Sequence, residues 1–211
     1  MWEHARLHEM IPSIITRAYM VASASVPLME CALERCERRT PGDPVAAGFA
    51  DYLRKHIPEE VGHDEDCLDD LEVLGVPRDE VARQYPYPSI VNMLGMQYYW
   101  VRHRHPIAFA GYLAIIEGHP ASAERIRQIQ RDTGLPAEAF RTLLWHADHD
   151  GDHTQELDEV LDGLPLSDDQ LGLIGINIAH TNSLLARSVY EMIKAFEARV
   201  AATPEKIAGS A

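Results

Sequence analysis

The sequence predicts an all-α protein that folds as a single compact bundle of about seven helices. Apolar residues recur at three- and four-residue spacing in nearly every long segment, which is the pattern of amphipathic helices. We find no convincing strand pattern, because apolar and polar residues do not alternate over any bounded run. The 211 residues, 46% of them hydrophobic, suffice for one helical domain over 1–211 with a substantial core.

Proline, glycine and polar clusters divide the chain into helical segments. The expected long helices are 12–38, 45–74, 89–103, 106–118, 120–133, 136–161 and a last helix from about 168 to about 202. This division predicts helices joined by short loops, which favours neighbours packed side by side in one bundle.

Prolines fall inside the first two segments. Pro12 suits a first-turn position, whereas Pro27 is expected to kink or split the first helix. Pro58 is expected to restart the second helix, which would place Glu59 and Glu60 in a first turn. Negative charge is favourable there, because the N-terminal end of a helix dipole is positive.

Helix ends are marked in the same way. Gly75 with Pro77 ends the second segment, and a short helix is expected at 78–84 in the linker that follows. Gly134 closes the fifth segment. The tail after about residue 202 is expected to be frayed, as chain ends commonly are.

The composition excludes several classes of function. The formal net charge of −14 disfavours nucleic acid and anionic membrane surfaces as partners. No apolar run approaches the length of a membrane span, and the N-terminus lacks a secretory apolar region, so we expect a cytoplasmic protein. Cys31, Cys36 and Cys67 are an odd number without paired spacing, which favours a reducing compartment and small apolar roles.

The most informative motif is HADHDGDH at 146–153. His146, Asp150 and His153 are spaced i, i+4, i+7, so a helix would place all three on one stripe. Two imidazoles and a carboxylate that point the same way form a set of metal ligands. The alternative is a solvated polar face, because the neighbouring residues are also polar and Gly151 weakens the helix.

Two upstream sites carry the same residue types. Glu60 and His63 form Glu-x-x-His, which helical bundles use in carboxylate-bridged two-metal sites. The alternative for this pair is an acidic, solvated helix start. Glu117 follows the apolar run GYLAII, where a carboxylate stays ionised only if something compensates its desolvation. A metal ion would do so, and the alternative is a helix-end glutamate that reaches solvent.

Together these sites offer three carboxylates and three imidazoles, without a thiolate. The predicted metal ligands are Glu60, His63, Glu117, His146, Asp150 and His153. This donor set suits iron, with manganese as the alternative metal, better than a structural zinc ion. Six such side chains are about what two iron ions need while positions stay open for dioxygen and substrate.

The motif order resembles that of the haem-oxygenase-like diiron oxidases and oxygenases. E-x-x-H is followed by E-G after an apolar helix and then by H-x3-D-x2-H, and the matching residues are Glu60, His63, Glu117, His146, Asp150 and His153. The resemblance extends in helix order from about residue 10 to 200. It implies a seven-helix haem-oxygenase-like fold that holds two iron ions and no haem. Some N-oxygenating members have an additional carboxylate ligand, for which Glu30 and Glu59 are the candidates here.

The resemblance also implies a function. The motifs are similar to those of an alkene-forming fatty-acid decarboxylase and of amine N-oxygenases. The resemblance therefore implies O2-dependent oxidation of a small organic metabolite, such as an amino acid, an amine or a fatty-acid-like molecule. An external electron donor and a homodimer are compatible with it. Two alternatives stay open. One is a metal-free enzyme of the same fold, of the thiamin-salvage or quinone-cofactor-synthesis type, and the other is a non-enzymatic metal-binding module.

Four residues are candidates for a substrate pocket: Tyr98, Tyr112, His180 and Arg187. Arg187 lies in the otherwise apolar run SLLARSVYEM and would bind a substrate carboxylate through two parallel hydrogen bonds. The alternative for Arg187 is a salt-bridged surface arginine. Aromatic residues at helical spacing are equally compatible with plain core packing.

Overall fold

The computed structural model describes residues 2–118 and 121–202, so the tail that we expected to be frayed lies outside the described residues. The α-helices are α1 Leu7–Glu37, α2 Pro44–Glu60, α3 His63–Val73, α4 Arg78–Ala82, α5 Pro88–His103, α6 Ala110–Ile116, α7 Ala123–Thr133, α8 Arg141–Gly163 and α9 Asp168–Ala202. Two short 3-10 helices, Pro106–Phe109 and Ala137–Phe140, precede α6 and α8. The all-α prediction is confirmed over this part of the chain.

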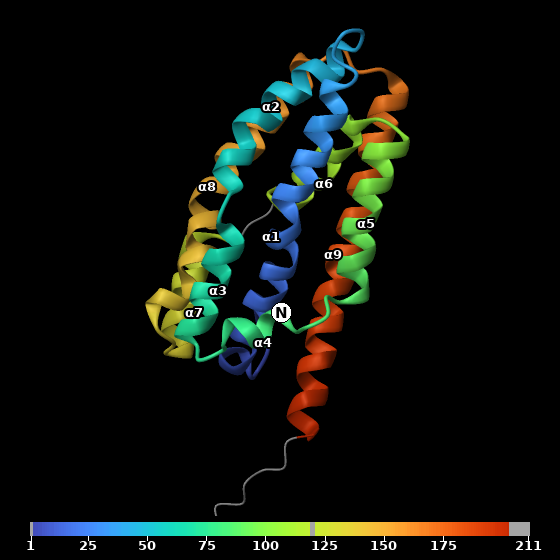
Figure 1. The fold of residues 1–211 in the computed structure, drawn as a ribbon. Coiled ribbons are helices and arrows are strands. Elements are labelled where there is room, and N and C mark those ends of the chain that lie inside the picture. The colour runs from blue at the N-terminus through green and yellow to red at the C-terminus, as the bar shows by residue number, and fades with distance from the viewer. Residues whose placement is uncertain (1, 119–120, 203–211) are drawn as a thin grey trace, which may run out of the picture.

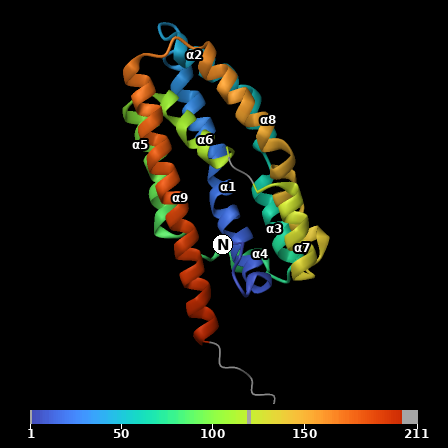
Figure 2. The ribbon, with the colours of Figure 1, turned by 180° about the vertical axis from the view of Figure 1, so that it is seen from behind.

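Helix α1 lies in the middle of the bundle (Figure 1). Helices α2, α3, α7 and α8 lie on one side of it and α5 and α9 on the other, and the view from behind shows the same grouping (Figure 2). The helix contacts agree, because α1 packs against α2, α3, α5 and α9. Among the described helices, none has both the length and the apolar character needed to cross a membrane.

Two buried clusters share α1. One includes Leu28 and Met29 of α1 with Phe49 of α2, and the other includes Met10 and Ile11 of α1. Because one long helix contributes to both clusters, a split in α1 would separate them. Helix α1 instead runs unbroken through Pro27, and the predicted split is wrong. Burial of the residues that follow Pro27 offsets the one backbone hydrogen bond that the proline removes.

The second predicted segment is divided at a different place from the one we expected. Pro58 lies inside α2, and the break comes after Glu60, where Val61 is extended and Gly62 has φ +100°. Gly62 tolerates this left-handed conformation because it has no Cβ. The division into α2 and α3, together with the short α4, explains why nine α-helices are described instead of about seven.

Helices α6 and α9 approach each other closely at Gly111. A Cβ atom at Gly111 would lie 2.6 Å from the carbonyl oxygen of Ile174 and 3.0 Å from the Cβ of Asn177. Only glycine fits such a contact without movement of backbone. The close contact fixes α6, which ends next to Glu117, against the longest helix of the bundle.

Candidate metal centre

The six predicted metal ligands lie together where α2 and α3 face α8. His63 Nδ1 lies 3.2 Å from Glu60 Oε2, and the rings of His63 and His146 are 4.9 Å apart. His153 Nδ1 lies 3.8 Å from Glu60 Oε1 and 3.5 Å from Glu117 Oε2. Residues from three separate parts of the chain therefore share one site. Asp150 completes the set, with its Oδ1 3.9 Å from His146 Nδ1.

A seventh side chain, His56, belongs to the same cluster and was missed in the sequence. Its side chain is completely buried, and its Nε2 lies at hydrogen-bond distance, 3.2 Å, from Glu117 Oε1. Its ring meets that of His153 edge to face, with centroids 4.7 Å apart. One ligand atom each from His56, Glu60 and His153 lie within 4.8 Å of one another, which is a geometry that can hold a metal ion.

The sequence does contain a signal for His56. His56, Glu60 and His63 have the spacing H-x3-E-x2-H, which repeats the H-x3-D-x2-H spacing of the motif at 146–153. The repeat matters because the two stretches run antiparallel: His56 meets His153, and His63 meets His146.

The antiparallel pairing produces two pairs of imidazoles with carboxylates between them. We call His56 with His153 the inner pair, and His63 with His146 the outer pair, because 34% of the His146 side chain is exposed. Glu60 on one stretch and Asp150 on the other each fall between the two histidines of their motif. Such an arrangement offers imidazoles at two positions and shared carboxylates in the middle, as a two-metal site requires.

The helix break positions Glu60 and His63. Glu60 is the last residue of α2 and His63 the first of α3, so the predicted Glu-x-x-His does not lie on one helix. The prediction that Glu59 and Glu60 occupy a first turn is also wrong. Both instead lie at the negative end of the α2 dipole, where a carboxylate is unfavourable and a bound cation would compensate.

Glu117 is placed by the end of α6. It caps that helix, and its N–H donates to Leu113 O. Gly118 allows the chain to turn away, because a Cβ there would lie 2.1 Å from Ala114 O. Only 8% of Glu117 is exposed, so the alternative of a glutamate that reaches solvent does not hold.

Carboxylates surround the inner pair and shift its protonation. Burial alone would lower the pKa of His56, but the hydrogen bond and the charge of Glu117 outweigh it and raise the pKa. Glu117 raises the pKa of His153 in the same way, against the effect of burial. Burial also pushes the pKa of Glu117 upward, yet the two imidazoles outweigh this and hold it below its ordinary value.

His146 of the outer pair and the carboxyl group of Asp150 have pKa shifts that differ from those of the inner pair. Burial, followed by the nearby His63, lowers the pKa of His146 to about 4, so its imidazole is neutral at pH 7. Burial and then the charges of Glu117 and Glu60 raise the pKa of Asp150 to about 8. A carboxyl group that burial and neighbouring carboxylates together keep protonated lies where negative charge is poorly compensated.

The donor atoms fit a metal ion. Nδ1 of His56 and Nδ1 of His146 are buried without a hydrogen-bond partner among the residues that the structure describes. Buried polar atoms are almost always partnered, and a metal ion would supply the missing partner here. The surrounding carboxylates and imidazoles are the ligand types that iron and manganese accept.

Aromatic rings fix the imidazoles from outside. Tyr52 stacks on His56 with ring centroids 5.2 Å apart, and Trp145 packs against His63 at 4.1 Å.

Glu59, one of the two candidates for an additional carboxylate, lies 3.6 Å from both His56 and His153. Glu30, the other candidate, is exposed on α1. Glu59 is therefore the better placed of the two.

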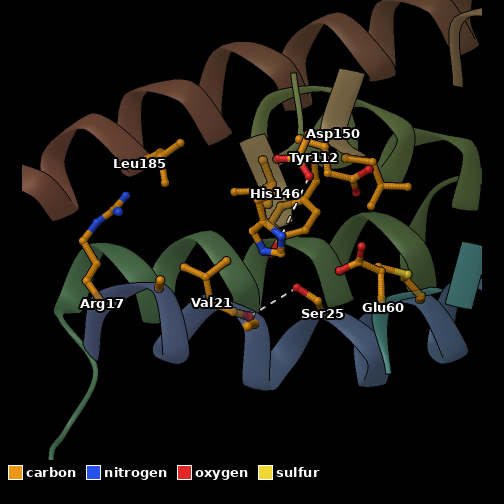
Figure 3. A pocket seen from close by; sticks show the side chains of 14 residues that line it. Arg17, Val21, Ser25, Glu60, Tyr112, His146, Asp150 and Leu185 are labelled. Carbon is orange, nitrogen blue, oxygen red and sulfur yellow. Dashed lines mark hydrogen bonds and ion pairs between the residues drawn. The ribbon is translucent and has the colours of Figure 1, made fainter. Parts of the chain in front are cut away.

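A cavity of about 200 Å³ adjoins the centre. Four of the predicted ligands form part of its wall: Glu60, Glu117, His146 and Asp150. The remaining wall is mainly apolar and comes from α1, α6 and α9 (Figure 3). The volume is enough for a molecule of about ten non-hydrogen atoms, since a 150 Å³ cavity holds benzene.

Of the four candidate substrate-binding residues, Tyr112 alone lines this cavity. Tyr98 packs against the core under Arg102. His180 is exposed, and Arg187 is exposed and paired with Glu191 at 3.2 Å. The expected carboxylate-binding role of Arg187 therefore does not fit its position, because α9 turns that residue away from the cavity.

The comparisons with known proteins identify the family and the fold. A family model described as iron-containing redox enzyme matches residues 19–173, and the chain belongs to this family. The matched range includes the four histidines and the three carboxylates of the candidate centre. No curated protein matches the sequence.

Solved structures confirm the haem-oxygenase-like fold. A domain from Shewanella denitrificans, described with a heme oxygenase-like fold, is similar with a TM-score of 0.80 and 17% identity over 96% of this chain and 85% of that one. A TenA homolog from Pseudomonas syringae has a TM-score of 0.69 and 14% identity over 92% and 86% of the two chains. A CADD-like protein from Nostoc punctiforme has a TM-score of 0.66 and 17% identity over 93% and 83%.

Proposed function

We propose that this protein is a non-haem iron oxidase or oxygenase that uses O2 to oxidise a small organic molecule. The observation that supports this most is the cluster of four imidazoles with Glu60, Glu117 and Asp150 beside a cavity. A site for small-molecule chemistry needs both features in one place. Iron ions bound by the cluster would supply the activation of dioxygen.

The protein's own residues have three tasks in this proposal. The imidazole pairs and the carboxylates beside them would hold two iron ions, and Glu60 lies near one histidine of each pair, 3.2 Å from His63 and 3.8 Å from His153. The helix ends at Glu60 and Glu117 fix the ligands, so that few rearrangements accompany the reaction. The apolar cavity wall excludes water and holds the substrate against the centre.

The alternative of a cysteine-based, metal-free enzyme of the same fold finds no support in the thiols. Cys36 and Cys67 are buried, and burial raises the pKa of each to about 12, which suppresses the reactive thiolate. The lining of the cavity, as far as the structure describes the chain, includes no cysteine. The alternative of a metal carrier conflicts with the burial of His56 and Glu117, which limits exchange of the metal.

The proposal is tested by iron loading and oxygen uptake. We expect protein incubated with ferrous ion under anaerobic conditions to bind about two iron ions per chain, and the loaded protein to consume O2 on mixing. The variants His56→Asn and His153→Asn should each lose iron. His180→Asn, which removes an exposed imidazole from α9, is the matched control and should load like the unchanged protein. Absence of iron uptake by the unchanged protein would overturn the proposal.

A further inference from the structure

Arg17 lies at the end of the cavity opposite the candidate metal ligands (Figure 3). It belongs to α1, and Val21 and Ser25 follow on the same face at successive turns toward Glu60. The eight residue-to-residue steps from Arg17 to Ser25 rise about 12 Å along the helix. The cavity is therefore elongated, with a guanidinium at one end and the carboxylate–imidazole cluster at the other.

Arg17 has no acidic partner among the residues that the structure describes. Its Nε donates to Ser188 Oγ at 2.7 Å, and no carboxylate lies within ion-pair distance. Arg78, by contrast, contacts three carboxylates at the surface. A half-buried cation without a counter-ion is costly unless an anion joins it.

Ser188 orients the guanidinium. The Ser188 hydroxyl donates to Leu185 O at 2.7 Å, so its oxygen is left to accept the Arg17 Nε hydrogen. This fixes one edge of the guanidinium against α9 and leaves the two terminal nitrogens for a ligand. Burial lowers the pKa of Arg17 to about 10, which still leaves it cationic at neutral pH.

The wall between the two ends is mainly apolar, with side chains that include Ala18, Val21, Ala22, Leu113, Ile116 and Leu185. Its polar members are Tyr112 and Ser25, and the Ser25 hydroxyl donates to Val21 O. Such a wall favours an aliphatic segment and offers no partner for a charged one.

We propose that the cavity binds a small aliphatic monocarboxylate, with its carboxylate on Arg17 and its alkyl chain directed at the metal centre. This inference rests on the proposed function for the identity of the metal centre, and it names the class of substrate. Planar guanidinium and carboxylate groups form paired charge-assisted hydrogen bonds, which both hold and orient the ligand. A cavity of about 200 Å³ fits a chain of the size of octanoate, which has about ten non-hydrogen atoms.

The same geometry disfavours α-amino acids. An ammonium group next to the carboxylate would need an acidic partner near Arg17. The acidic residues in the described lining are Glu60, Glu117 and Asp150, all at the metal end. An α-ammonium group would therefore be desolvated without compensation, so octanoate should bind better than 2-aminooctanoate.

The test is calorimetric titration of the 211-residue chain, metal-free and metal-loaded, with octanoate. Octanol and 2-aminooctanoate serve as probes that lack the carboxylate or add an ammonium. We expect Arg17→Gln to weaken octanoate binding by about 10- to 100-fold and to leave octanol binding unchanged. Arg17→Lys keeps the charge without the paired geometry, and should give an intermediate loss. Arg187→Gln removes an exposed arginine from α9 and is the matched control, with binding within about two-fold of the unchanged protein.

Two results would overturn the inference. One is unchanged octanoate affinity in an Arg17→Gln protein whose thermal unfolding matches that of the unchanged protein. The other is the absence of octanoate binding to both metal-free and loaded protein. Failure of the proposed function looks different, because it would appear as missing iron uptake while octanoate binding to the metal-free protein still depends on Arg17.

Discussion

The two imidazole pairs of the metal centre differ in their electrostatic surroundings. Glu117 contacts both members of the inner pair, His56 and His153, and raises the pKa of each. In the outer pair, burial and His63 lower the pKa of His146 to about 4. At neutral pH, His146 therefore presents a free electron pair, whereas the raised pKa values of the inner pair favour protons with which a metal ion must compete. Similar ligand types thus give two positions that should differ in pH dependence.

The largest effect is expected from Glu117→Gln, which keeps the shape of the side chain and removes its charge. Without that charge, the inner position should lose metal affinity by more than about 100-fold, whereas the outer position keeps its imidazoles. Iron content measured by metal analysis should fall from about two ions per chain to about one. Loss of both ions, or of neither, would show that the two positions do not differ in the way described.

The next effect concerns Asp150 in the metal-free protein. Because its pKa is raised to about 8, the folded state holds a proton that the unfolded state releases near pH 4. The unfolded state then binds fewer protons between these values, so the free energy of unfolding falls as pH rises from about 4 to about 8. The raised pKa values of His56 and His153 act in the same direction, since their stabilisation is present below about pH 6.5 and is lost as pH rises through the folded-state values.

Denaturant unfolding at pH 5 and pH 8 measures this dependence. We expect the metal-free protein to be less stable at pH 8 by on the order of 2 kcal/mol, and Asp150→Asn to remove a large part of the difference. An unchanged pH dependence in Asp150→Asn would contradict the raised pKa of this group. Asp152→Asn, which alters an exposed carboxylate on the same helix, is the control.

The number of protons released on metal binding should also differ between the inner and outer positions. For the inner position, we expect affinity to rise by about ten-fold per pH unit for each proton displaced. Titration with cobalt(II), followed by its visible absorption between pH 6 and pH 8, would separate the two binding steps. Glu117→Gln should abolish the steeper step and leave the shallower one in place. If the affinity of both binding steps rose equally with pH, the inner and outer positions would not differ in the way described.

The smallest effect is expected at the helix break. Gly62 has φ +100°, so Gly62→Ala should destabilise the fold by about 1–2 kcal/mol, and should also weaken iron loading because Glu60 and His63 flank it. Gly95→Ala is the matched control, because this residue lies within α5 with open space around its Cα. That change should instead stabilise the protein by about 0.5–1 kcal/mol, which thermal unfolding can measure.

Sequence periodicity predicted the helices better than their ends. Gly134 was predicted as a helix end and does cap α7 with φ +66°. Pro58 was expected to restart a helix, but it lies inside α2, and the unremarkable pair Val61 and Gly62 makes the break. Proline removes one hydrogen bond, whereas a left-handed glycine redirects the chain. Helix propensity alone does not show whether the proline or the glycine ends the helix.

The six candidate metal ligands were predictable because three of them share a helical stripe, whereas His56 and Arg17 were missed. The spacing of His56 to Glu60 and His63 repeats that of the motif at 146–153, but nothing in the run KHIPEE marks His56 as buried. Its importance comes from the antiparallel pairing with His153, which is a tertiary contact. Arg17 was missed for the same reason, since only the folded structure shows that it lacks a carboxylate and faces a cavity.

The close contact at Gly111 has a consequence for the span of the cavity. Through this contact α9 fixes α6 and therefore Glu117, and through Ser188 the same helix holds Arg17. One continuous helix thereby sets the separation between the charged ends of the cavity. For the aliphatic carboxylate proposed above, this fixed separation should make binding sensitive to chain length, and a bulkier residue at position 111 would shift the preferred length without any change in the lining itself.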